Sequence, residues 1–127
     1  MTKTDCVFCK ITSGDEPAQI VRRGIHSLTI VPLNPVTEGH VIVIPYAHVK
    51  DATQDPHVTA NTMGDAAVYA QTNNVGPCNF ITSVGREATQ SVFHLHIHVV
   101  PRKENDGLAL PWYSGKTRKS STANVTH

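Results

Sequence analysis

The sequence predicts an α+β domain built on an antiparallel sheet. Five short segments rich in β-branched and apolar residues are mostly joined by turns, and one substantial helical segment lies among them. Strands joined mainly by turns favour antiparallel pairing. A chain of 127 residues suits one compact domain, which would bury about two-thirds of its unfolded surface. We expect that domain to span residues 1–115, followed by a polar tail over residues 116–127.

The first half of the chain should contain a short N-terminal helical turn and three strands. The turn is expected over residues 6–11, with an end near Gly14, and the strands over residues 18–23, 27–33 and 40–45. The last of these strands contains Val-Ile-Val-Ile, a nearly continuous β-branched run. Such a run is typical of a central strand that is covered on both faces.

The main helix should begin at Asp55 and Pro56, a capping residue followed by a proline at the first helical position. We expect the helix to reach residue 73 or 74. Its core-facing stripe is predicted to contain Val58, Met63, Ala66, Ala67 and Ala70. A fourth strand is expected over residues 78–84, and a loop over residues 85–89 leads to the fifth.

The fifth strand, expected over residues 91–100, carries an unusual row of histidines. His94, His96 and His98 alternate there with the apolar residues Leu95, Ile97 and Val99. This period of two predicts a half-buried strand with its apolar face on the core and three imidazoles on the other face. The alternative is a solvated face that is rich in histidine by composition, although packing alone does not favour repeating the side chain that titrates near neutral pH.

The spacing of these histidines limits what one metal ion could bind. Side chains two apart on a strand face lie about 6.6 Å apart at the backbone, and those four apart about 13 Å. A tetrahedral metal can take neighbours in such a row, but reaching both His94 and His98 would be strained. We therefore expect a division of labour, with one end of the row serving structure and the other a substrate.

Imidazoles also have the chemistry for phosphoryl transfer. A neutral imidazole can attack phosphorus as a nucleophile, and a second one can protonate the leaving group. Negative charge on the phosphate oxygens then needs hydrogen-bond donors, for which Gln90, Ser91 and His40 are candidates.

Composition argues against several other classes of function. The formal net charge of +1 gives no strong field toward nucleic acid or an anionic membrane. The N-terminus lacks a signal-peptide pattern, and no apolar run approaches membrane-spanning length, so we expect a cytoplasmic protein with reduced thiols. Cys6 and Cys9 have the spacing of metal ligands, or of a redox pair in another context.

Four motifs in order resemble those of the histidine triad (HIT) family of nucleotide hydrolases and transferases. The first is Cys6-Val-Phe-Cys9-Lys-Ile, and the second is Asn34-Pro-Val-Thr-Glu-Gly-His40 with its continuation to His48. The others are Gly85-Arg-Glu-Ala-Thr-Gln90-Ser91 and the triad His94-Leu-His96-Ile-His98-Val-Val. The resemblance covers most of the chain, and it implies a five-stranded antiparallel sheet with one helix, usually paired into a homodimer.

The resemblance also implies roles for individual residues. His96 would attack the α-phosphorus of a nucleotide to form a covalent nucleotidyl-histidine, which water then hydrolyses. His98 and His40 would act beside the phosphate, and the substrate would be held by Gln90, Ser91, Asn34 and Ser83. The implied substrates are adenosine or guanosine phosphoramidates, aminoacyl adenylates and dinucleoside polyphosphates. Two other functions are possible interpretations of the sequence. One is a nucleotide-binding module with little turnover, and the other is a hydrolase with catalytic zinc on two triad histidines.

In the Cys-x-x-Cys branch of the family, two cysteines and two histidines hold a structural zinc ion. The corresponding residues here are Cys6, Cys9, His48 and His94, and two thiolates with two imidazoles suit a closed zinc site. The alternative is that the cysteines are small buried hydrophobes. No organic cofactor is expected.

Three positions depart from the family pattern. Pro32 stands where an acidic or amide residue commonly holds the ribose, Ser83 stands where asparagine is common, and Thr89 replaces a glycine. Threonine at that position should restrict the backbone if it has a positive φ. We expect Trp112 to pack into the core, and the alternative is that it approaches the active site near a dimer interface.

Overall fold

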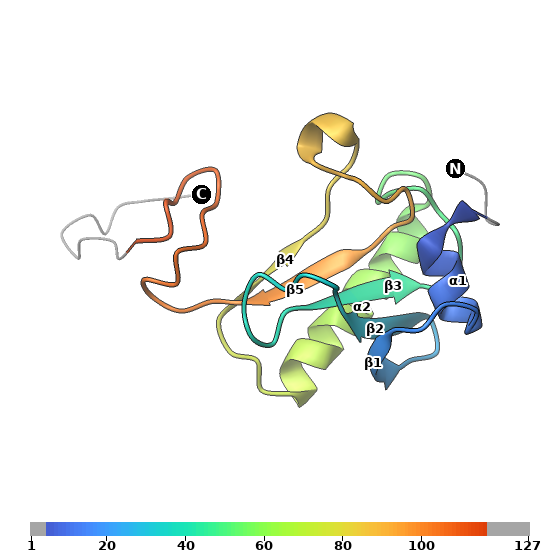
Figure 1. Ribbon diagram of the computed structural model, residues 1–127, viewed down its shortest axis with the longest axis horizontal. Helices are drawn as coiled ribbons and strands as arrows, with labels where there is room; N and C mark the ends of the chain where they lie inside the picture. The colour runs from blue at the N-terminus through green and yellow to red at the C-terminus, as the bar shows by residue number, and fades with distance from the viewer. Residues whose placement is uncertain (1–4, 117–127) are drawn as a thin grey trace.

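The structure is a computed structural model, and it describes residues 5–116. Five strands form one sheet in the order β1-β2-β3-β5-β4, in which every neighbouring pair is antiparallel (Figure 1). The strands are β1 (Gln19–Arg23), β2 (Ser27–Val31), β3 (Val41–Pro45), β4 (Cys78–Ile81) and β5 (Ile97–Pro101). The helices are α1 (Val7–Ser13), α2 (Pro56–Thr72) and the short 3-10 helix η2 (Arg86–Ala88). The predicted α+β class with an antiparallel sheet is confirmed.

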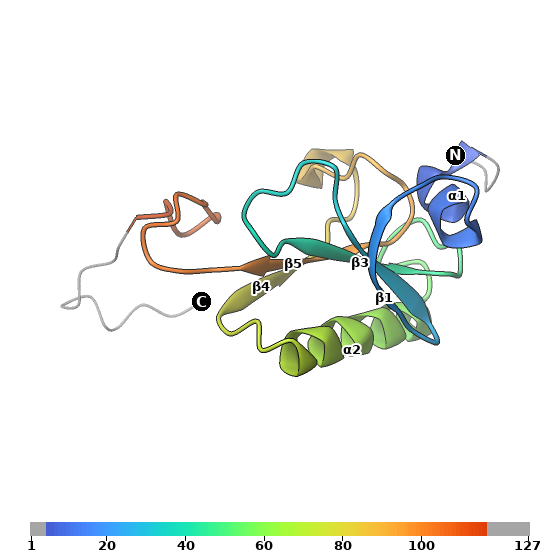
Figure 2. The ribbon, with the colours of Figure 1, turned by 60° about the horizontal axis from the view of Figure 1, so that its bottom comes forward.

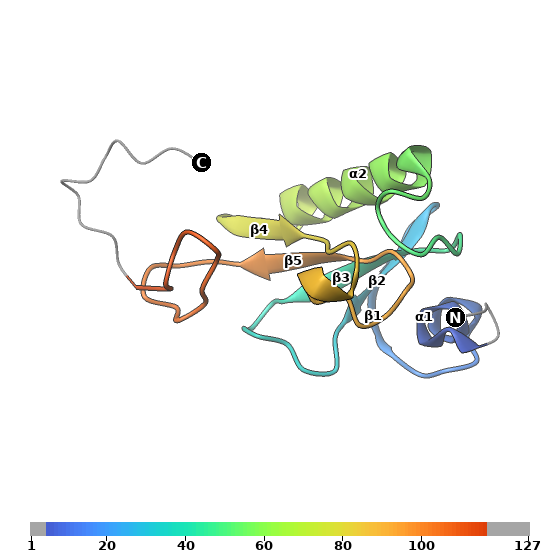
Figure 3. The same cartoon turned by 90° about the horizontal axis from the view of Figure 1, so that it is seen from above.

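The central strand β3 is buried along its whole length, as its β-branched run predicts. Val41 and Val43 pack toward α2, while Ile42 and Ile44 pack with Phe8 of α1. Figures 2 and 3 show α2 on one side of the sheet, with η2 and the loop over residues 32–39 on the opposite side. The fold therefore has a core on each face of the sheet.

Helix α2 begins and ends close to the predicted positions. The Asp55 carboxylate accepts a hydrogen bond from the His57 backbone N–H at 3.0 Å, so it satisfies one of the free donors of the first turn. The predicted stripe is only partly right, because Met63 and Ala67 are exposed whereas Thr62 is fully buried. The Thr62 hydroxyl donates to the Val58 carbonyl at 2.7 Å, which allows a polar residue on the buried face.

The histidine strand is shorter than predicted, because β5 begins at Ile97 and residues 91–96 are irregular. Two bonds outside the β-ladder explain the change: the Leu95 N–H donates to the Val49 carbonyl at 2.8 Å, and the Thr82 hydroxyl donates to the His96 carbonyl at 2.8 Å. The alternation itself is confirmed, since Leu95, Ile97 and Val99 are all buried against the α2 side.

The C-terminal part of the chain runs beyond the end of β5 (Figure 1). Trp112 is 58% exposed, so the prediction that it packs into the core is wrong. The predicted polar tail falls almost entirely on residues 117–127, which lie outside the described residues. Within residues 5–116, no helix combines the length and apolar character needed to cross a membrane.

Candidate active site and metal centre

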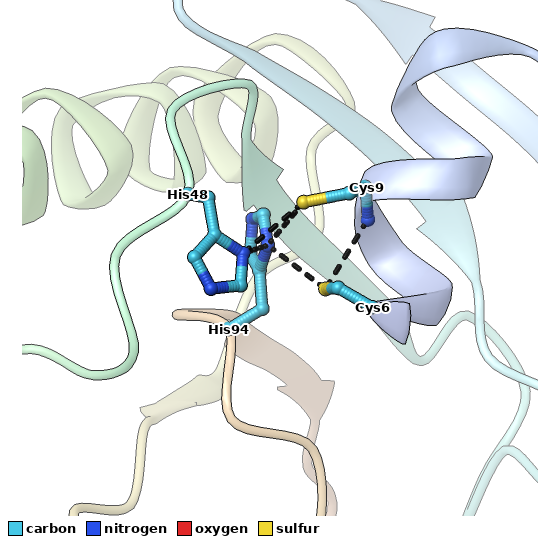
Figure 4. A group of neighbouring side chains, drawn as sticks. All are labelled: Cys6, Cys9, His48 and His94. Carbon is cyan, nitrogen blue, oxygen red and sulfur yellow. Dashed lines mark hydrogen bonds between the residues drawn. The ribbon is translucent and has the colours of Figure 1, made fainter. Parts of the chain in front are cut away.

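Two cysteines and two histidines from distant parts of the chain meet at one end of the sheet (Figure 4). Cys6 caps α1, Cys9 lies in its first turn, His48 follows β3, and His94 precedes β5. Their ligand atoms all lie within 4.8 Å of one another. The Cys9 Sγ lies 3.1 Å from the His48 Nδ1, which is itself 3.1 Å from the His94 Nδ1. The structure thus brings together all four residues that the resemblance implies.

The donor set fits a tetrahedral metal ion. Bonds of the usual zinc lengths would place neighbouring ligand atoms roughly 3.3–3.8 Å apart. Four of the separations lie between 3.1 and 3.5 Å, close to this range, and among them is the 3.3 Å from the Cys6 Sγ to the His94 Nδ1. The hydrogen bond of the second ring nitrogen of His94 also fits a metal site. Its Nε2–H donates to the Pro45 carbonyl at 2.9 Å, which leaves Nδ1 free for a metal. Burial lowers the pKa of His94 to about 4, which keeps the ring neutral and able to ligate.

The middle histidine of the triad is held in one tautomer. The Nδ1 atom of His96 lies 2.8 Å from the carbonyl of His94, and a carbonyl can only accept, so Nδ1 carries the proton. Nε2 is then left with a lone pair. Burial lowers the pKa of His96 from its ordinary value of 6.5, so the ring is neutral near pH 7. Phe8 packs edge-on against it, with the ring centroids 5.0 Å apart.

His40 and His98 form a hydrogen-bonded pair beside His96. The Val36 backbone N–H donates to the Nδ1 of His40 at 3.0 Å, so the proton of the neutral His40 ring is on Nε2. This Nε2–H donates to the Nδ1 of His98 at 2.9 Å, which places the proton of a neutral His98 on Nε2. Burial, together with the neighbouring His96 and His40, lowers the pKa of His98 to about 4. All three rings can therefore act as neutral groups with defined donor and acceptor atoms.

Two cavities flank these rings. The smaller, of about 360 Å³, lies toward β4 and the C-terminal segment, and the larger, of about 680 Å³, lies toward α1 and β2. The larger cavity has a mainly apolar wall that includes Phe8, Ile11 and Ile30. His96 and His98 line both cavities. A substrate with its reacting atom at His96 could place one half in each cavity.

The predicted substrate-binding residues divide between the two cavities. Ser83 and Gln90 line the smaller one, whereas Asn34 and Ser91 line the larger one. The amide of Gln90 is already bonded to the backbone, because it accepts from the Gly85 N–H at 2.9 Å and donates to two carbonyls. These three bonds give Gln90 a structural role, because they fix the loop that carries Ser91.

The same loop contains a strained residue. Thr89 has a φ of 75° in the left-handed region, which is unfavourable for a β-branched side chain and costs about 1–2 kcal/mol. The sequence comparison with the family pattern anticipates this strain at a position where glycine is usual. Hydrogen bonds from the Thr89 and Gln90 backbone N–H groups to the Arg86 and Gly85 carbonyls close the loop around it.

Arg102, which lines the smaller cavity, forms a charged pair with Asp106 that was not identified from the sequence. Arg102 donates to the Asp106 carboxylate at 2.8 Å and 3.1 Å, to the Asn79 side-chain oxygen at 2.7 Å, and to the Leu108 carbonyl. The Arg102 bonds hold the pKa of Asp106 well below its usual range. The pair fixes the segment that forms one wall of the cavity. Both residues lie in segments that resemble the family, but the pairing itself has no signal in the sequence beyond two opposite charges four residues apart, which is common on protein surfaces.

Comparisons with known proteins agree with the geometry. The HIT domain family matches residues 13–105 of the chain. An adenosine 5′-monophosphoramidase from Schizosaccharomyces pombe is 33% identical over 114 residues, which cover 86% of this chain and 84% of that protein. An adenylylsulfatase from Arabidopsis thaliana is 33% identical over 126 residues, which cover 94% of this chain and 61% of that protein.

A solved structure is also similar. The crystal structure of a zinc-bound histidine triad family protein from Mycobacterium smegmatis has a TM-score of 0.73 and 36% sequence identity. The match covers 85% of this chain and 82% of that chain.

Proposed function

The chain belongs to the HIT family, and from that premise we propose that it hydrolyses nucleotides at the α-phosphorus with His96 as the nucleophile. The observation that carries the proposal is the bond from His96 Nδ1–H to the His94 carbonyl, which leaves a lone pair on Nε2 of a ring that lines both cavities. The similarity to a monophosphoramidase and an adenylylsulfatase supports this class of reaction.

In the proposed first step, Nε2 of His96 forms a bond to phosphorus as the bond from phosphorus to the leaving group breaks. The positive charge that develops on the ring is stabilised through Nδ1–H by the His94 carbonyl. The negative charge of the bound phosphate raises the pKa of the neighbouring His98, which can then give a proton to the departing group. In the second step, water attacks the phosphorus and releases the nucleoside monophosphate and the His96 ring.

Trapping the covalent intermediate tests this proposal. After brief incubation with a radiolabelled adenosine phosphoramidate and quenching in base, label should remain on His96 and be released by acid, because a phosphorus–nitrogen bond to histidine is acid-labile. The matched control is the exposed His26, whose replacement by alanine should leave the labelling unchanged. If the protein binds the nucleotide but hydrolyses it no faster than buffer does, the result would instead support the alternative of a nucleotide-binding module with little turnover.

We further propose that the nucleoside occupies the larger, mainly apolar cavity and the leaving group the smaller one. Among residues 5–116, the one cation that lines the smaller cavity is Arg102, and its charge is already balanced by Asp106. A polyphosphate leaving group would bring several negative charges there without a free cation. An amine leaving group brings none, which favours phosphoramidates over dinucleoside polyphosphates.

Substrate preference can be measured with adenosine on both compounds. Leaving one charged group without a partner costs about 1–3 kcal/mol, so we expect kcat/KM to be roughly tenfold or more higher for an adenosine phosphoramidate than for a diadenosine polyphosphate. An equal or higher kcat/KM for the diadenosine compound would contradict the assignment of the smaller cavity.

We also propose that Cys6, Cys9, His48 and His94 hold a structural zinc ion. The support is the closed set of two sulfur and two nitrogen ligands and the similarity to a zinc-bound family member. Bound zinc would supply a cross-link between α1 and the sheet. Because Phe8 and Ile11 of α1 line the larger cavity, that cross-link would also fix the wall of the nucleoside cavity.

The homodimer implied by the family resemblance remains a proposal. Helix α2 and the edge strand β4 expose apolar side chains, among them Met63, Val68 and Phe80. A second copy of the chain would remove these side chains from water.

A further inference from the structure

Thr89 is the least expected residue in the loop beside the triad. Within residues 5–116, the other non-glycine residues with a positive φ are Asn74 and Asn105. Asparagine tolerates this region because its short side chain can bond to the local backbone, whereas a β-branched residue does not. Glycine would hold the same turn without strain. A strained residue is retained where the surrounding structure forces it, and such residues cluster at functional sites.

The position of Thr89 relates the strain to the reaction. The two cavities meet at the lining residues that they share, which are Thr89, His96 and His98. A substrate with one half in each cavity must place its phosphorus at this junction. The Thr89 side chain is exposed, and its hydroxyl has no hydrogen-bond partner among the described residues. The junction therefore contains an unused donor next to the proposed nucleophile.

From these observations, and resting on the proposed function, we infer that Thr89 is a catalytic residue whose hydroxyl donates to a phosphoryl oxygen of the substrate. The hydroxyl supplies a neutral donor where His98 and His40 are already bonded to each other. The closed loop holds the side chain in place, because the Gln90 amide and the two backbone bonds fix residues 85–90. Donors fixed before the reaction are the ones that stabilise developing charge most effectively.

Three substitutions separate the hydroxyl from the strain. Thr89→Val keeps the branched shape and the strain but removes the hydroxyl, Thr89→Gly removes both, and Thr89→Ser keeps the hydroxyl. A hydrogen bond to a charged group is worth a factor of roughly 10 to 100, so we expect the valine and glycine variants to lose that much in kcat/KM. The serine variant should stay within about threefold of the wild type, since it retains the donor. The Tm of Thr89→Gly should not fall, because the glycine relieves strain.

Two results would overturn the inference. One is a wild-type rate in Thr89→Val, and the other is a loss in Thr89→Ser as large as that in Thr89→Val. A loss that follows Tm across the three variants would assign Thr89 a structural role instead and would also count against it.

A binding measurement keeps this test distinct from that of the proposed function. The wild type should bind AMP more tightly than adenosine, and Thr89→Val should lose most of this preference, because the hydroxyl contacts the phosphate. If the wild type has no turnover, the proposed hydrolase fails, and the ratio of AMP to adenosine affinity still decides the role of Thr89. An unchanged ratio in Thr89→Val rejects that role even if the wild type is active.

Discussion

Replacing His96 with alanine is expected to lower kcat/KM for an adenosine phosphoramidate by roughly 10⁴- to 10⁶-fold, the usual effect of removing a nucleophile. No other side chain in the junction offers a ring nitrogen with a free lone pair, since the Nδ1 lone pair of His98 already accepts a hydrogen bond from His40. Steady-state kinetics measure the loss. AMP affinity should change much less, which would show that the fold and both cavities are intact. Full turnover by the variant would show that His96 is not the nucleophile.

The pH dependence of kcat/KM in the wild type is an independent test of the role of His96. Burial lowers the pKa of His96 from 6.5, and the nucleophile is the neutral form. The neutral form predominates above the lowered pKa and is lost as the pH falls through it. We therefore expect the acid limb of the kcat/KM profile, which reports the loss of neutral His96, to lie below pH 6.5, the ordinary histidine value. His26→Ala should give the same profile, because its ring is exposed and lies outside both cavities.

Removing the metal is the second change with a large expected effect. The purified protein should contain about one zinc ion per chain, because four ligands close one site. A chelator should lower the free energy of unfolding by about 4 kcal/mol if free zinc was 1,000 times its Kd, which corresponds to a fall in Tm of roughly 10–20 °C. Metal analysis and thermal unfolding with and without chelator measure both quantities.

The cysteines provide a matched pair of variants for this prediction. Cys9→Ser should lose zinc and lower Tm, whereas Cys78→Ser should keep one zinc ion per chain, since Cys78 lies in β4 outside the Cys/His group. Protein that carries no zinc before any chelator is added, and whose Tm chelator does not change, would show that the group is not a zinc site.

Local signals in the sequence were enough for much of the fold. Asp55 and Pro56 fix the start of α2 through capping chemistry that needs no tertiary contact, and the β-branched run of β3 reflects burial on both faces. The alternation of Leu95, Ile97 and Val99 likewise identified the buried face correctly. The positive φ of Thr89 could be anticipated only by comparison with the family pattern.

The remaining features depend on contacts between distant segments. β5 starts late because the backbones of Leu95 and His96 bond outside the ladder, to Val49 and Thr82, and a strand pattern cannot show such bonds. The local Cys-x-x-Cys spacing also could not select its two histidines, which the resemblance to the family provided. The bonds of Arg102 to Asn79 and Leu108 join segments whose proximity no periodicity reveals.

His94 occupies two roles with different atoms, because its ring faces the cysteines while its carbonyl holds the proton of His96. A substitution at His94 would remove a metal ligand from the same residue whose backbone carbonyl orients the His96 ring, so any shift of that backbone would also change the support of the nucleophile. A substitution at Cys6 or Cys9 removes a metal ligand from a residue that makes no bond to His96. Variants designed to change the metal site without disturbing the nucleophile should therefore carry substitutions at Cys6 or Cys9.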